Sequence, residues 1–111
     1  MQSSVSLLLL LTLAFNAASF NNQELVDLYN KGIEKKDAYL LIATDYLDPD
    51  SIIDFEIFVP PSTDVQKEIT RHTAPGMERV LNVYKLDKKI IDYEELKNKD
   101  VLDSLNTSGK Q

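Results

Sequence analysis

Acidic side chains gather in one short stretch of this 111-residue chain and are the first candidates for chemistry. Within twelve residues the chain carries Asp45, Asp48, Asp50, Asp54 and Glu56. Divalent cations such as Ca²⁺ bind carboxylate oxygens, so Asp48 and Asp50 are candidate metal ligands. An EF-hand loop needs a glycine at its sharp turn, and this stretch has Pro49 and no glycine. A solvated connector whose charges protect an edge strand explains the same residues.

His72 is the one histidine in the sequence, and it follows Arg71 before a Pro-Gly turn. A general base needs a group that orients it and a nucleophile to activate, and no spaced motif supplies either one. We therefore expect a solvent-exposed loop histidine.

The chain has no cysteine, so thiol chemistry and a standard structural zinc site are excluded. No cofactor motif is present, and no cofactor is expected.

Partner binding is the second chemistry that these residues could perform. Asp45, Asp48 and Asp50 could bind a partner together with Phe58, which falls on the polar side of its predicted strand. An exposed Phe58 would be an interface anchor, whereas a helix that covers it would make it part of the core. Asn106 begins an Asn-Thr-Ser sequon, which we expect to be accessible to glycosylation in a flexible tail.

The N-terminal segment indicates where the protein is found. Residues 1–19 contain no charged side chain, residues 5–14 are largely apolar, and Ala17-x-Ser19 satisfies the small-x-small rule. This pattern predicts a secretory signal peptide that is cleaved after Ser19, although its start lacks Lys and Arg. The apolar run is shorter than the ~20 residues of a spanning helix, so no stable membrane anchor is expected. The alternative is an uncleaved, cytosolic protein.

The remaining chain is predicted to be one secreted α+β domain over residues 20–106, followed by a disordered tail over residues 107–111. It carries the whole net charge of −6, which disfavours nucleic acid as a partner. Small secreted domains often depend on disulfides. Without cysteine, this fold must depend on its apolar core, a bound partner or a homo-oligomer formed through a sheet edge.

Three strands and three helices are expected to position these residues. Residues 38–44 form an unbroken apolar run that is typical of a central strand buried on both faces, and residues 53–59 alternate like its neighbour. Residues 80–86 give the third strand, and residues 45–51 are interpreted as a polar connector.

Capping patterns predict the helices. The segment Asn21–Glu24 is a capping box that precedes apolar residues at helical spacing, in a helix that ends near Lys36. A second capping box begins at Thr63, and Asp92 caps a last helix that could break near Asp100. The order α-β-β-α-β-α predicts a small α+β domain with helices packed on a three-stranded sheet.

Three segments carry a resemblance to known proteins, namely residues 36–48, Phe58–Pro61 with Asp64 and Val65, and Met77–Tyr84. Together they resemble a family of short bacterial and phage proteins to which no activity is assigned. The resemblance implies a compact α+β unit and no functional residue. The chain departs from the family in its signal peptide and in a connector lengthened by residues 51–53.

Two function classes follow. The first is a small acidic secreted protein that binds a protein partner without catalysis. The second is a small cation-dependent hydrolase that uses the acidic connector with His72. The absence of a catalytic motif favours the first class.

Overall fold

The computed structural model describes residues 19–48, 51–73 and 78–109. In chain order the elements are α2 (Asn22–Glu34), β1 (Tyr39–Asp48), β2 (Ser51–Val59), α3 (Val65–Arg71), β3 (Arg79–Lys85), α4 (Tyr93–Lys97) and α5 (Leu102–Gly109). The strands form an antiparallel sheet in the order β2-β1-β3. The predicted α+β class and the three-stranded sheet are confirmed.

β1 is the central strand, and both of its faces are buried. Leu40 and Ile42 pack into one apolar cluster, whereas Leu41 and Ala43 pack into another on the opposite face. Successive side chains of a strand point to opposite faces, so a strand covered on both sides needs apolar residues at every position. This requirement explains the unbroken apolar run in the sequence.

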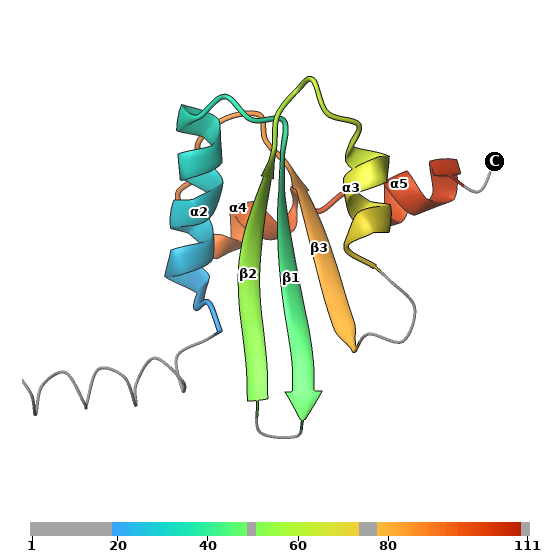
Figure 1. The fold of residues 1–111 in the computed structure, drawn as a ribbon. Coiled ribbons are helices and arrows are strands. Elements are labelled where there is room, and N and C mark those ends of the chain that lie inside the picture. Colours follow the sequence, from blue (N-terminus) through green and yellow to red (C-terminus); the bar gives the residue numbers. More distant parts are fainter. Residues whose placement is uncertain (1–18, 49–50, 74–77, 110–111) are drawn as a thin grey trace, which may run out of the picture.

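Helices cover the two faces, with α2 and α3 on opposite sides of the sheet (Figure 1). Val26 and Tyr29 of α2 pack with Leu96 of α4 against one face, which we call the α2 face. Val65 and Ile69 of α3 pack against the other, here called the α3 face, where residues of α5 join them. The helices therefore enclose the sheet in three layers.

Local hydrogen bonds define where α2 begins and where it ends. The capping box is present, since the Asn21 side chain accepts from the Glu24 N–H and the Glu24 side chain accepts from the Asn21 N–H. At the other end Lys36 adopts φ 63°, and its N–H donates to the Ile33 carbonyl. The Asp37 N–H donates to the Gly32 carbonyl, which completes a Schellman motif.

Gly32 lets α2 approach the sheet closely. A Cβ atom at this position would lie 2.8 Å from Leu86 Cδ1 and 3.3 Å from Phe58 Cε1. Gly32 is therefore packed closely against Leu86 and Phe58, with no room for a larger residue unless these side chains move.

A polar network joins α2 to the segment after β3. The Tyr29 hydroxyl lies 2.7 Å from the Lys85 carbonyl oxygen and 3.0 Å from Asp87 Oδ1. Burial raises the pKa of Tyr29 to about 12. The Lys99 ammonium donates to Asp87 at 2.9 Å and, with the Lys88 and Tyr29 donors, lowers the pKa of the Asp87 carboxyl to about 2.

Two boundary predictions were wrong. The expected connector 45–51 is mostly strand, because β1 continues to Asp48 and β2 begins at Ser51. The break that was expected near Asp100 is present between α4 and α5, where the chain adds to the edge of β3. There the Lys85 N–H donates to the Lys99 carbonyl and the Val101 N–H donates to the Val83 carbonyl. α5 continues to Gly109, inside the segment that was expected to be a tail.

Candidate functional site

Strands β1 and β2 extend past the helices, and no described helix covers the α2 face at that end of the sheet (Figure 1). Tyr46 and Ile52 are direct partners across the two strands, and Val80 of β3 lies one row away, opposite Thr44. All three point to the α2 face by strand alternation. Their exposed fractions are 45%, 40% and 48%. We call these three residues the sheet-end patch.

Acidic residues surround the sheet-end patch. On the same face of β2, Asp54 is half-buried and Glu56 is exposed, and Glu78 is exposed directly before β3. The backbone places Glu78 beside the patch, because the Tyr46 N–H donates to its carbonyl oxygen at 2.8 Å. The patch therefore has an apolar centre and a negative border.

The α3 face of the same sheet end carries an ion pair between Asp45 and Arg79. These residues are direct partners across β1 and β3, and the guanidinium contacts both carboxylate oxygens. Their side chains are 18% and 11% exposed. The hydrogen bonds from Arg79 lower the pKa of the Asp45 carboxyl and raise the pKa of Arg79. Asp45 is therefore a paired strand residue, and its assignment to a connector was wrong.

Arg79 also connects the sheet to the end of α3. Its Nη1 donates to the His72 carbonyl at 3.0 Å, and its guanidinium carbon lies 5.0 Å from the centre of the Phe55 ring. One arginine thus contacts β1, β2 and the C-cap of α3. These contacts give the mostly buried Arg79 side chain a structural role, and no functional role is needed to explain it.

His72 is the C-cap residue of α3, and its side chain is 24% exposed. The expectation of a solvent-exposed loop histidine was wrong, because the ring packs at 6.4 Å from the Phe55 ring. Its Nε2 lies 3.8 Å from Glu68 Oε1, one turn earlier. The neighbouring Thr73 hydroxyl donates to the Ile69 carbonyl at 2.8 Å, so it is engaged in the helix end. The contacts of His72 are therefore explained by its structural role at the end of α3.

The structure does not test the candidate metal ligands Asp48 and Asp50. Asp48 ends β1, its side chain is not described, and Asp50 lies outside the described residues. Among residues 19–48, 51–73 and 78–109 no group of three or more potential metal-ligating side chains is found. Asn106 lies within α5 rather than in a tail.

Phe58 lies under α2. It is half-buried and packs against the α2-face cluster, with the Lys35 ammonium 4.0 Å from the centre of its ring. Of the two alternatives for this residue, the structure shows the one in which a helix covers it. The exposed apolar surface on this face lies further along the strands, at the sheet-end patch.

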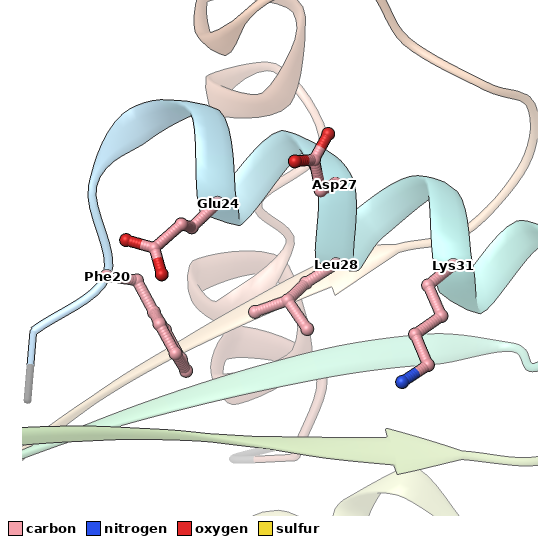
Figure 2. Close-up of a pocket in the computed structure, with 5 residues that line it drawn as sticks. All are labelled: Phe20, Glu24, Asp27, Leu28 and Lys31. Carbon is pink, nitrogen blue, oxygen red and sulfur yellow. The ribbon is translucent and has the colours of Figure 1, made fainter. Parts of the chain in front are cut away.

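An open groove lies along the N-terminal half of α2 (Figure 2). Its volume is about 250 Å³, and its lining residues are Phe20, Glu24, Asp27, Leu28 and Lys31. In Figure 2 Phe20 and Leu28 point toward the strands, whereas the Asp27 carboxylate points away from them. No pattern in the sequence indicates this groove, since Phe20 precedes the helix cap and belongs to no periodic apolar pattern.

Comparisons with known proteins add no identity to this geometry. The chain matches no protein-family model, and neither the curated proteins nor the solved structures gave a match. No helix in the described ranges has the length and apolar character needed to cross a bilayer.

Proposed function

We propose that this chain is a small secreted interaction protein that binds a basic protein partner through the sheet-end patch, without catalysis. The observation that carries the proposal is the exposure of Tyr46, Ile52 and Val80 together on one uncovered sheet face. Contiguous exposed apolar side chains on a small domain mark interaction surfaces. The N-terminal signal-peptide pattern supports an extracellular setting.

The chemistry of the patch selects the class of partner. Tyrosine is enriched among residues that dominate binding energy, and Tyr46 stands between the two aliphatic side chains. The exposed carboxylates of Glu56 and Glu78 and the net charge of −6 favour basic residues around a partner's apolar anchor. Such charges chiefly raise the association rate and exclude acidic competitors.

The proposal is tested by selecting a random peptide library on the full secreted chain. We expect selected peptides to combine lysine or arginine with an aromatic or aliphatic residue. Tyr46→Ser should weaken their binding at least ~10-fold, because removal of a central anchor costs more than ~1.4 kcal/mol. Ile91→Ser is the matched control, since Ile91 is 84% exposed and lies outside the patch.

Three results would contradict the proposal. One is the selection of acidic peptides, and another is equal loss of binding in the Tyr46→Ser and Ile91→Ser variants. The third is a concentration-dependent dimer in sedimentation that Tyr46→Ser abolishes, which would make a second copy of the chain the occupant of the patch. Thermal unfolding of both variants controls for the fold.

A further inference from the structure

Phe20 is the point at which the N-terminal chain joins the core. Its side chain packs against the α2-face cluster, while the preceding Ser19 is exposed. Its ring lies beside Leu28 in the groove (Figure 2). A bond between an exposed residue and an anchored one is a clear boundary between the domain and the segment before it.

The Phe20 backbone nitrogen meets a carboxylate from a distant strand. It donates to Asp54 Oδ2 at 2.7 Å, across 34 positions of sequence. The other oxygen, Asp54 Oδ1, is buried and has no hydrogen-bond partner among the described residues. A buried carboxylate oxygen without a partner is costly, and groups of this kind are rare in folded proteins.

One peptide N–H cannot satisfy this carboxylate, because an amide nitrogen carries a single proton. A terminal ammonium carries three donors and a positive charge, and a charge-assisted hydrogen bond is about twice as strong as a neutral one. An ammonium at the position of the Phe20 nitrogen could reach both oxygens of Asp54. The Phe20 nitrogen therefore lies at ion-pair distance from the Asp54 carboxylate, but as a peptide nitrogen it carries no positive charge.

We infer that the bond between Ser19 and Phe20 is a processing site, and that the α-ammonium of Phe20 in the mature chain forms an ion pair with Asp54. The inference rests on the proposed secretion, which supplies a signal peptidase. Hydrolysis adds the hydroxyl of water to the Ser19 carbonyl carbon and a proton to the Phe20 nitrogen. The freed amine takes a second proton from solvent below its pKa.

The charged side chains that line the groove beside Phe20 carry a net negative charge, which favours the ammonium form. From α2, Glu24 and Asp27 line the same groove, and Lys31 is the one cation among its lining residues. From the sheet, Asp54 of β2 makes the direct contact. The dipole of α2 is unfavourable to a positive charge near its N-terminus. The attraction of the Asp54 carboxylate must therefore exceed this repulsion.

The test begins with the intact mass of the protein from the medium of eukaryotic cells that express the full chain. We expect a species that starts at Phe20. Its α-amine is then labelled by reductive ¹³C-methylation, which preserves the charge, and titrated by NMR. We expect a pKa about one unit above the ordinary range of about 7.7–8.0, and a return to that range in Asp54→Asn.

Glu56→Gln is the matched control, because it removes one negative charge from the same face of the same strand. It should move the titration by much less than Asp54→Asn. A raised amine pKa also gives stability that is complete below pH 8 and lost as pH rises through the raised value. The wild-type titration decides the matter even where Asp54→Asn fails to fold.

Each failure points to a different step. A chain that stays uncleaved inside the cell overturns the proposed secretion. A secreted chain that starts at another residue overturns this processing site and leaves secretion intact. A chain that starts at Phe20 with an ordinary amine pKa, or with the same pKa in Asp54→Asn, overturns the ion pair alone.

Discussion

At the scale of single residues, Arg79 joins three parts of the described structure. It pairs with Asp45, donates to the His72 carbonyl and stacks near Phe55. Its planar fork of donors suits this task, since lysine would offer a point charge and no bidentate geometry. The C-terminus of α3 is thereby fixed to the sheet.

Replacing Arg79 with methionine should lower the free energy of unfolding by about 2–3 kcal/mol at pH 7. The cause is the mostly buried Asp45 carboxylate, which would lose its partner; breaking a fully buried pair costs about 3–5 kcal/mol. The double variant Asp45→Leu/Arg79→Met should regain most of the loss. Urea denaturation of the single and double variants measures both effects.

The stability that the Asp45–Arg79 pair contributes depends on pH. Arg79 lowers the pKa of the Asp45 carboxyl, so the pair contributes stability above the unfolded pKa of about 3.9. That contribution falls as pH drops through the folded pKa. The difference between wild type and Arg79→Met should therefore narrow below pH 4, and a constant difference would show that the loss is one of packing.

At the scale of elements, the end of α2 contains a residue in an unfavourable conformation. Lys36 is the one non-glycine residue with positive φ among the described residues, and it occupies the position that most Schellman motifs give to glycine. A left-handed conformation costs an L-residue roughly 1–2 kcal/mol. The hydrogen bonds to the Ile33 and Gly32 carbonyls hold it in place.

Lys36→Gly should therefore stabilise the protein by about 0.5–1 kcal/mol, after the entropy of the glycine in the unfolded chain is subtracted. Lys35→Gly is the control, because Lys35 has an ordinary helical φ of −76° and gains nothing from glycine. Thermal unfolding compares the two. Stabilisation by both variants would contradict the conformational argument and indicate an effect of lost charge.

At the scale of the whole molecule, the three strands differ in how their backbones are paired. β1 pairs on both sides, whereas β2 pairs with β1 alone within the described ranges. β3 has its outer edge bonded near Lys85 by the segment before α5. A nine-residue edge strand with exposed Ile52 and Ile53 is the kind of edge to which another chain can add.

Hydrogen exchange should follow this pairing in the isolated protein. We expect the slowest amides in β1, because its N–H groups are bonded to one neighbour or the other in a strand buried on both faces. Alternate amides of β2 point outward and should exchange much faster. Uniform protection along β2 would show that its edge is covered, and a dilution series would then distinguish a second copy from a fold contact.

Much of this fold could be predicted from local patterns. The capping box at Asn21, the unbroken run from Ala38 and the alternation from Ile53 each reflect constraints that act within one element. Helix caps, strand period and burial on both faces depend on neighbours in sequence. The placement of Phe58 opposite Phe55 followed from the same period.

The tertiary structure decided what those patterns left open. The sequence predicts a connector at Asp45, whereas the structure pairs it across the sheet with Arg79, 34 positions away. His72 reads as a loop residue until Phe55 and Arg79 meet it at the end of α3. The contact between Phe20 and Asp54 has no sequence signal either. The sequence by itself determined the elements, because their hydrogen bonds and periods are local. Only the tertiary structure determined the charge pairs and the uncovered sheet end, because they depend on which distant segments pack together.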